Sequence, residues 1–266
     1  MEKINETYPV SFVGTGPGDP ELLTVRAKKR MNEADCIFYD CLPAEAVLRE
    51  SAPNAKIIYV NKHPENGEPI PNILDLIQEK YTEGKKVVRL KAGDGMMFNG
   101  GDVEARKMKE RGIPCEFIPG ITAACAASNI FAIPTTEKFK SNAVVHLIAD
   151  DISDNFEHIR AVAKLLEYGT TIALYMAYDN LQAIFDIFKQ EGVDFNIPVV
   201  ITSMISLSDE DCAKATMDTV FQVIEEREML SPFVFFIGKY VDFYLSPKSK
   251  TDKLKSFINA RGAMVH

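Results

Sequence analysis

The stretch V-S-F-V-G-T-G-P-G-D-P-E-L-L-T-V, residues 10–25, decides the fold class of this chain. Its apolar beginning is typical of a buried strand, and its alternating glycines form a tight turn directly after that strand. Asp19 is a good N-terminal cap, and Pro20 suits the first turn of a helix. The stretch therefore predicts a strand, a flat glycine turn and a helix, which together begin an α/β fold.

The same glycines raise the question of a dinucleotide-binding loop, because Asp40 closes the next apolar run at a matching distance. The third glycine of that fingerprint is missing, and Asp19 and Glu21 place two carboxylates at the start of the helix. These carboxylates already satisfy the positive end of the helix dipole and would repel a pyrophosphate. The sequence therefore disfavours a nicotinamide oxidoreductase.

Strand and helix patterns alternate along the rest of the chain, which predicts βαβ units and a mostly parallel sheet in the first half. A polar break at residues 138–142 interrupts this alternation, and near the end two strand patterns flank one helix, which predicts a partly antiparallel second half. We expect strands at residues 10–13, 36–39, 57–60, 86–90, 114–118, 143–148, 171–175, 198–202, 212–217 and 232–237. We expect helices at residues 21–32, 72–81, 103–111, 156–167, 181–190 and 220–226, and an alanine-rich helix from residue 121. These patterns predict two α/β domains, residues 1–131 and 143–245, with a linker at 132–142 and a polar tail at 246–266.

The composition excludes several classes of function. The chain has 266 residues and a net charge of -8, which argues against broad nucleic-acid binding because phosphate contacts need basic surface. Its five cysteines form no CxxC pair, which argues against a structural zinc and fits free thiols in a reducing compartment. No signal-peptide pattern is present, and no apolar run approaches the roughly 20 residues that span a bilayer. We therefore expect a cytoplasmic protein without membrane or nucleic-acid partners.

Three loops built from small residues follow predicted strands, at residues 14–18, 91–101 and 119–124. Ordinary turn chemistry explains any one of them alone. In open α/β sheets, however, ligands bind at the carboxyl ends of the strands, where such loops lie. Together the three loops predict a cleft with little side-chain bulk.

The motif V-G-T-G-P-G-D-P-E-L-L-T-V-R-A, residues 13–27, resembles the opening motif of the tetrapyrrole methylase family. The resemblance extends over about residues 10–241, through A-D-C-I-F-Y-D-C-L, V-V-R-L-K-A-G-D, G-I-P-C-E-F-I-P-G-I-T-A-A, L-Y-M-A and S-P-F-V-F-F-I-G-K-Y-V. It implies two α/β domains of the class III methyltransferase type, with the active site in the cleft between them. It also implies S-adenosylmethionine as methyl donor, S-adenosylhomocysteine as product, and a homodimer.

The Y-D-C-L and R-L-K-A-G-D motifs are most similar to those of family members that C-methylate uroporphyrinogen III. The implied product is precorrin-2, in sirohaem and cobalamin biosynthesis. One alternative keeps the cofactor but changes the acceptor to a precorrin-4-type corrin intermediate or a peptide. Another alternative is a non-catalytic relative that binds a tetrapyrrole.

The resemblance also assigns residues to the site. It implies catalytic or substrate-side roles for Asp40 and Lys62, and cofactor contacts at Pro17, Ala92, Gly93, Asp94, Met97, Thr122, Ala123, Met176 and the backbone near Ile205. Asp40 could accept the proton that methylation releases or stabilise a cationic intermediate, and Lys62 could pair with a substrate carboxylate. The plain alternatives are a loop cap for Asp40, a solvated side chain for Lys62 and core packing for Met176.

The chain departs from the family pattern at three places that bear on the acceptor. The turn at residues 91–102 lacks the arginine that the family carries between its glycines, and it is one residue shorter. P-T-T-E-K at residues 134–138 replaces P-L-T-H-R, and S-M-I-S at 203–206 replaces E-N-G-T. Because arginine binds carboxylates bidentately and lysine does not, these departures predict weaker recognition of a polycarboxylate acceptor.

Overall fold

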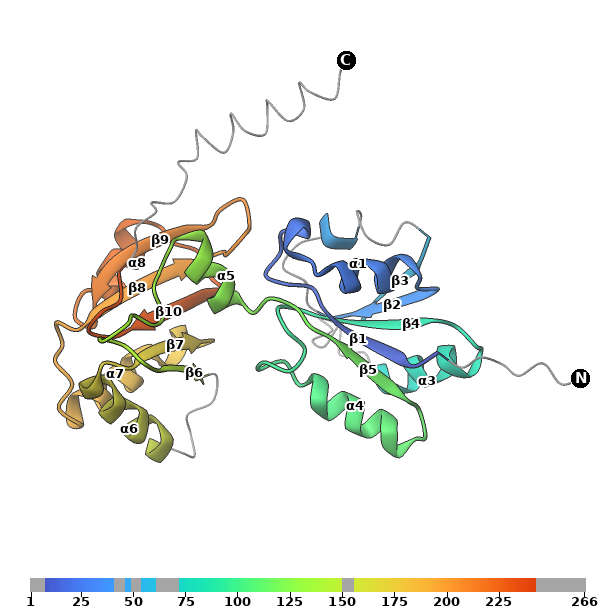
Figure 1. The fold of residues 1–266 in the computed structure, drawn as a ribbon, viewed down its shortest axis with the longest axis horizontal. Coiled ribbons are helices and arrows are strands. Elements are labelled where there is room, and N and C mark those ends of the chain that lie inside the picture. The colour runs from blue at the N-terminus through green and yellow to red at the C-terminus, as the bar shows by residue number, and fades with distance from the viewer. Residues whose placement is uncertain (1–7, 41–45, 49–53, 61–71, 150–155, 243–266) are drawn as a thin grey trace, which may run out of the picture. The chain divides into compact units, whose positions relative to one another are not determined.

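The computed structural model describes residues 8–40, 46–48, 54–60, 72–149 and 156–242. The chain divides into two compact units, Met1–Ala123 and Ala124–His266. Each unit has its own five-stranded sheet (Figure 1). The predicted α/β class with two sheets is confirmed. The predicted linker at residues 132–142 falls within the second unit, and the predicted tail at 246–266 lies outside the described residues.

The first unit is built on a parallel sheet, as the alternating pattern predicts. Its strands run in the order β3-β2-β4-β1-β5, and every described pair is parallel. Parallel strands end at one edge of a sheet, so the loops after β1, β4 and β5 start side by side. The strands are β1 (Val10–Gly14), β2 (Cys36–Tyr39), β3 (Lys56–Tyr59), β4 (Val87–Lys91) and β5 (Cys115–Ile118).

Helices cover both faces of this sheet (Figure 1): α1 (Val25–Asn32) on one face, and α3 (Ile73–Thr82) with α4 (Gly101–Glu110) on the other. Side chains on β1 alternate between two cores. Phe12 belongs to the cluster that contains residues of α3 and α4, and Val13 belongs to the cluster that contains residues of α1. Two buried faces explain why these strands appear in the sequence as continuous apolar runs.

The start of α1 differs from the predicted helix at residues 21–32. Thr24 caps α1, because its Oγ1 accepts a hydrogen bond from the Ala27 amide at 3.1 Å, and the helix begins at Val25. Asp19 is a cap as predicted, but of a separate short 3-10 helix, Pro20–Leu22, where it accepts from the Glu21 amide at 2.8 Å. Because Asp19 and Thr24 each cap a helix of their own, the single predicted helix is divided into two.

The second unit has a mixed sheet in the order β6-β7-β10-β8-β9. Only β6 and β7 pair in parallel, and the other three pairs are antiparallel, so the predicted partly antiparallel sheet is confirmed. Because β10 runs against both β7 and β8, these two strands end at the same edge. The strands are β6 (Val144–Ile148), β7 (Thr171–Tyr175), β8 (Pro198–Ser203), β9 (Asp211–Thr216) and β10 (Phe233–Ile237).

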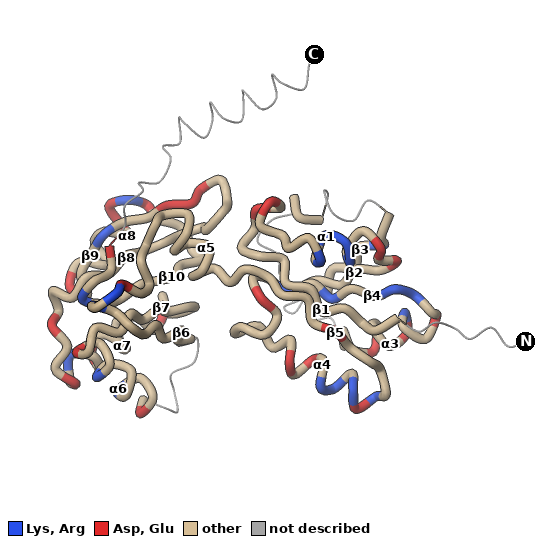
Figure 2. The backbone as a smooth tube through the Cα atoms, in the orientation of Figure 1, with Lys and Arg blue, Asp and Glu red and all other residues tan. Residues whose placement is uncertain are grey.

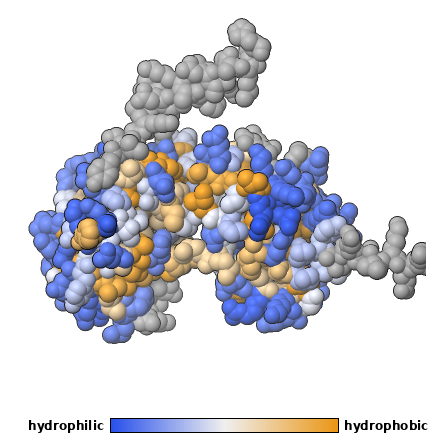
Figure 3. Space-filling model, in the orientation of Figure 1, coloured by the Kyte–Doolittle hydropathy of each residue, from blue (hydrophilic) through white to orange (hydrophobic). Residues whose placement is uncertain are grey.

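The core of the second unit lies between this sheet and three helices. Ile159, Phe188 and Ile224 of these helices are buried in one cluster with Leu174 and Phe235 of the sheet. On the face shown in Figure 3, hydrophilic residues cover much of each unit and hydrophobic residues form smaller patches. Among the described residues, no helix is long and apolar enough to cross a membrane. The helices are α5 (Ala123–Ile130), α6 (Phe156–Leu165), α7 (Leu181–Gln190) and α8 (Val220–Glu226), with short 3-10 helices at Leu166–Tyr168 and Tyr178–Asn180.

Candidate functional site

The three small-residue loops of the first unit meet backbone to backbone at the carboxyl edge of the sheet. Gly16 and Gly93 exchange two backbone hydrogen bonds, with N to O distances of 3.0 and 2.8 Å. A Cβ atom on Gly120 would lie 2.0 Å from the carbonyl oxygen of Gly93, and one on Gly14 would lie 2.6 Å from the Gly120 nitrogen. Only glycine fits at positions 14 and 120, where the backbones of the three loops pack against one another at the edge where α/β sheets bind ligands.

Asp94 ties two of these loops together. One of its carboxylate oxygens accepts a hydrogen bond from the Gly120 amide at 2.9 Å, and the other accepts from the Met96 amide at 2.9 Å. In the same loop, the Asn99 amide group donates to the carbonyl oxygen of Ala92. The side chains of Asp94 and Asn99 thus bind the backbone of these loops and fix its path.

The structure places the predicted cofactor residues of the first unit in these loops or at their ends. Pro17 follows β1 and is buried, whereas the residues after β4 and β5 are partly exposed. Seven predicted cofactor residues lie in these loops or at their ends: Pro17, Ala92, Gly93, Asp94, Met97, Thr122 and Ala123.

The other two predicted cofactor residues lie in the second unit, at the edge where β7 and β8 end. Met176 follows β7 with a φ of 47°, and φ is 49° at Met204 and 62° at Ser206, on either side of Ile205. Positive φ is strained for residues with side chains, and such strain concentrates at functional sites. Met176 is 50% exposed, which disagrees with a role in core packing, whereas Ile205 is buried.

Asp40 lies directly after β2 and contacts Arg89, which sequence reasoning did not identify. Arg89 donates from Nη1 and Nη2 to the two carboxylate oxygens of Asp40, at 3.0 and 2.8 Å. Its Nε and Nη2 also donate to the two oxygens of Glu104, at 2.8 and 3.0 Å. Lys91 donates from Nζ to Glu104 at 2.5 Å. We call Asp40, Arg89, Lys91 and Glu104 the charge cluster.

The charge cluster is enclosed by protein. The side chains of Arg89, Lys91, Asp40 and Glu104 are 0%, 1%, 6% and 16% exposed, respectively. Burial lowers the pKa of Lys91, and the positive charge of Arg89 adds to this effect. Burial also opposes the charge of Glu104, but the hydrogen bonds and positive charges of Arg89 and Lys91 together outweigh it and lower the pKa of that carboxyl. Burial opposes the charge of Arg89 as well, but its hydrogen bonds and charge interactions with Glu104 and Asp40 together outweigh burial and raise its pKa.

One sequence signal could have revealed the charge cluster. Arg89 and Lys91 are two residues apart in an otherwise apolar parallel strand, so their side chains lie on the same face of the sheet. Charged side chains are almost never buried there unless they are paired. Figure 2 shows that α4, which covers this face, carries acidic residues toward its beginning and basic residues toward its end. Glu104 is one of those acidic residues and supplies the partner.

Two further predictions concern residues elsewhere. Lys62 lies outside the described residues. Glu137, which replaces a family histidine, pairs with Lys140 at 2.6 Å, so its negative charge is offset by a neighbour. Within the described part of the chain, no group of three or more His, Cys, Asp or Glu side chains gathers in a way that could hold a metal ion.

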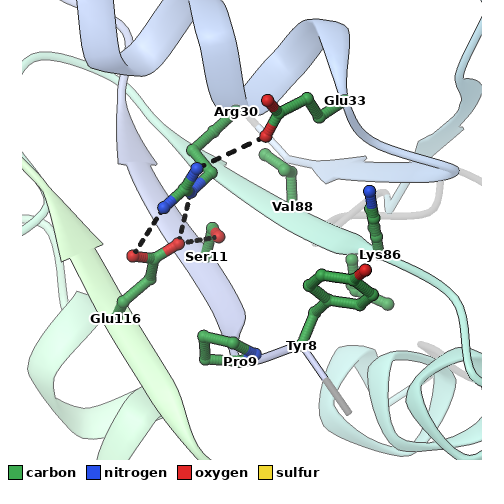
Figure 4. Close-up of a pocket in the computed structure, with 9 residues that line it drawn as sticks. Tyr8, Pro9, Ser11, Arg30, Glu33, Lys86, Val88 and Glu116 are labelled. Atoms are coloured by element: carbon green, nitrogen blue, oxygen red, sulfur yellow. Dashed lines mark hydrogen bonds and ion pairs between the residues drawn. The ribbon is translucent and has the colours of Figure 1, made fainter. Parts of the chain in front are cut away.

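A cavity of about 210 Å³ in the first unit lies away from these loops (Figure 4). Its lining includes Tyr8 and Lys86, at the amino-terminal ends of the strands. The Arg30 and Glu116 side chains point toward one another at 2.6 Å, and Ser11 donates to Glu116 at 2.6 Å (Figure 4). Because these polar groups satisfy one another at the edge opposite the glycine junction, the cavity is not the candidate site.

Comparison with known proteins identifies the family. The model of the Tetrapyrrole (Corrin/Porphyrin) Methylases matches residues 9–220. The uroporphyrinogen-III C-methyltransferase of Bacillus subtilis (strain 168) is 32% identical over 238 residues, covering 88% of this chain and 91% of that protein. The siroheme synthase of Pseudomonas aeruginosa (strain UCBPP-PA14) is 31% identical over 256 residues, which cover 96% of this chain but 53% of that longer protein.

A solved structure agrees with this assignment. The uroporphyrin-III C-methyl transferase from Thermus thermophilus, complexed with S-adenyl homocysteine, has a TM-score of 0.71 and 27% sequence identity. The match covers 87% of this chain and 98% of that one. The predicted enzyme class, a methyltransferase that uses S-adenosylmethionine as methyl donor, is confirmed. From its fold, its glycine junction and these matches, the chain belongs to the tetrapyrrole (corrin/porphyrin) methylases.

Proposed function

We propose that this chain transfers methyl groups from S-adenosylmethionine to carbon atoms of uroporphyrinogen III and forms precorrin-2. The observation that carries the proposal is the glycine junction, where three loops of small residues pack backbone to backbone at the carboxyl edge of a parallel sheet. The acceptor is supported by the similarity to the Bacillus subtilis uroporphyrinogen-III C-methyltransferase, which extends over 91% of that protein. A homodimer, which the family resemblance implies, and a cytoplasmic location, which the free cysteines indicate, belong to the same proposal.

The residues at the glycine junction fit an adenosyl cofactor. At Gly14 and Gly120 the space of a Cβ atom is occupied by the backbone of a neighbouring loop, so the loops meet here without side chains between them. Asp94 and Asn99 hold these loops in place. The cofactor supplies an activated methyl group on a sulfonium ion. Since that methyl is already activated, the protein has mainly to position the two reactants and exclude water.

Asp40 is the proposed catalytic group on the acceptor side. An ionised carboxylate there would stabilise positive charge on the acceptor as the methyl group is transferred. Lys62 is the proposed partner of an acceptor carboxylate. Glu137 stands where the family has a histidine, and its negative charge would repel a carboxylate of the acceptor. Its pairing with Lys140 reduces that repulsion.

The test is anaerobic incubation of the full chain with labelled S-adenosylmethionine and enzymatically made uroporphyrinogen III, followed by mass spectrometry. We expect a doubly methylated product, and we expect Asp40→Asn to lose most of the activity. Asp75→Asn is the matched control, because Asp75 is an exposed acid on α3 paired with Arg111. If the cofactor binds but no methyl group reaches uroporphyrinogen III, the proposed acceptor is wrong, and precorrin-4-type intermediates and peptides are tested next.

A further inference from the structure

The guanidinium of Arg89 is held from two sides by carboxylates that belong to different elements. Its five N–H bonds are all used: two for Asp40, two for Glu104 and one for the carbonyl oxygen of Leu90 at 3.1 Å. Asp40 follows β2, Arg89 belongs to β4 and Glu104 belongs to α4. The bidentate contacts on both edges fix the plane of the guanidinium, because each pair of parallel hydrogen bonds specifies one geometry.

Glu104 allows Arg89 to keep its two hydrogen bonds to Asp40. The charge cluster contains two cations and two carboxylates, so its formal charge is balanced when all four groups are ionised. Lys91 uses Glu104 as its carboxylate partner. Without Glu104, Arg89 and Lys91 would compete for the single remaining carboxylate of the cluster, and Arg89 would lose the contacts on one edge.

We propose that Glu104 is a positioning residue for methyl transfer, which fixes Arg89 and through it holds the Asp40 carboxylate ionised and in one orientation. This inference rests on the proposed catalytic role of Asp40. Glu104 itself reaches Asp40 only through Arg89. Its removal should therefore slow the transfer step and leave binding of the donor nearly unchanged, because the glycine junction is built from other residues.

The first experiment compares Glu104→Gln, Glu104→Asp and Glu110→Gln in the full chain. Glu110 is the matched control, because it is an exposed glutamate at the end of the same helix. We expect Glu104→Gln to lower the single-turnover rate with uroporphyrinogen III by 10- to 100-fold, with the Kd for S-adenosylhomocysteine within about twofold of the parent. Glu104→Asp should recover part of the rate, and Glu110→Gln should match the parent. A parental rate in folded Glu104→Gln would overturn the proposal.

A second variant separates positioning from folding. Glu104→Gln leaves two buried cations with one carboxylate, and this imbalance can unfold the protein. Lys91→Met combined with Glu104→Gln removes one charge of each sign and restores the balance. We expect this double variant to fold and bind S-adenosylhomocysteine, yet to remain slow because Arg89 has lost one of its two carboxylates. A double variant with the parental rate would show that Glu104 serves stability alone.

A third measurement does not depend on the acceptor. In protein labelled with ¹³C at the aspartate carboxyl carbons, the Asp40 signal is assigned by its loss in Asp40→Asn. We expect that signal to shift in the Lys91→Met and Glu104→Gln double variant and to stay in place in Glu110→Gln. If the parent does not methylate uroporphyrinogen III, the proposed function is wrong, and this signal still tests the positioning. An unchanged Asp40 signal in the double variant would overturn the inference.

Discussion

At the scale of single residues, the backbone junction of Gly14, Gly93 and Gly120 carries the strictest requirement in the first unit. Gly93 has a φ of +64°, a backbone conformation that residues with side chains rarely adopt. At Gly14 and Gly120, the atoms that would meet an added Cβ are backbone atoms at 2.0 to 2.8 Å, so no rotamer change relieves the collision. A backbone shift would be needed, and it would move the loops that we propose to bind the cofactor. This junction therefore couples loop stability to ligand binding.

Gly120→Ala should abolish binding of S-adenosylhomocysteine and lower the free energy of unfolding by about 1–3 kcal/mol, the usual cost of overpacking. Calorimetric titration and denaturant unfolding measure the two effects. Gly84→Ala is the control, because Gly84 has a φ of +75° but nothing within 4 Å of the added Cβ. Its strain should cost a comparable amount of stability, about 1–2 kcal/mol, without loss of binding. Equal binding by both variants would contradict this role of the junction.

Sequence reasoning at this scale identified the loops but not the partners of their residues. Asp40 stands at the end of a recognisable strand, so its place at the carboxyl edge followed from the pattern. Its pairing with Arg89 did not, because the two residues are 49 positions apart and meet only through the strand order β2-β4. Glu104 is only 15 positions from Arg89, and its pairing depends instead on which face of the sheet α4 covers. Contacts that depend on how strands are ordered cannot be obtained from local periodicity.

At the scale of elements, α1 illustrates how a cap decides where a helix begins. Thr24 accepts from the Ala27 amide, and its hydroxyl also donates to the carbonyl oxygen of Pro119 at 3.2 Å. One side chain thus begins α1 and attaches it to the loop after β5. The apolar spacing of residues 21–32 could not reveal this, because the 3-10 helix and α1 continue a similar hydrophobic pattern. The sequence offers two capping residues, Asp19 and Thr24, and its pattern does not show which of them begins α1.

Thr24→Ala should lower the free energy of unfolding by about 1 kcal/mol, the usual value of an N-terminal cap. The loss arises because the Ala27 amide no longer has its side-chain acceptor. Thr24→Ser keeps the hydroxyl and should recover most of the stability. Denaturant unfolding of the three proteins measures the effect. If the alanine and serine variants were equally stable, the cap would contribute nothing to α1.

At the scale of the whole molecule, each unit has hydrophobic clusters of its own. The cluster around Phe188 contains only residues of the second unit, and the cluster around Met108 contains only residues of the first. The sequence predicted both α/β units and the partly antiparallel second sheet, because the period of apolar residues is a local property. It placed the boundary at residues 132–142, at a polar break, whereas the contacts divide the chain between Ala123 and Ala124.

Phe188→Ala should destabilise the second unit by about 3–5 kcal/mol, because it leaves a cavity in a fully buried core. Hydrogen exchange followed by mass spectrometry should show faster exchange in β7, β8 and α7, with exchange in the first unit nearly unchanged. Met108→Ala, in the core of the first unit, should give the reverse pattern. Equal acceleration in both units would mean that the two unfold together as one cooperative structure.

The glycine junction also limits how this chain can change over generations or in a directed-evolution library. Compensating mutations usually work by shrinking one side chain to make room for another. At Gly14 and Gly120 no such trade exists, because each residue already lacks a side chain and the close neighbours are main-chain atoms, and at Gly93 the φ of +64° disfavours any side chain. These three codons are therefore best left fixed when acceptor preference is randomised, and the diversity is better placed at residues 134–138.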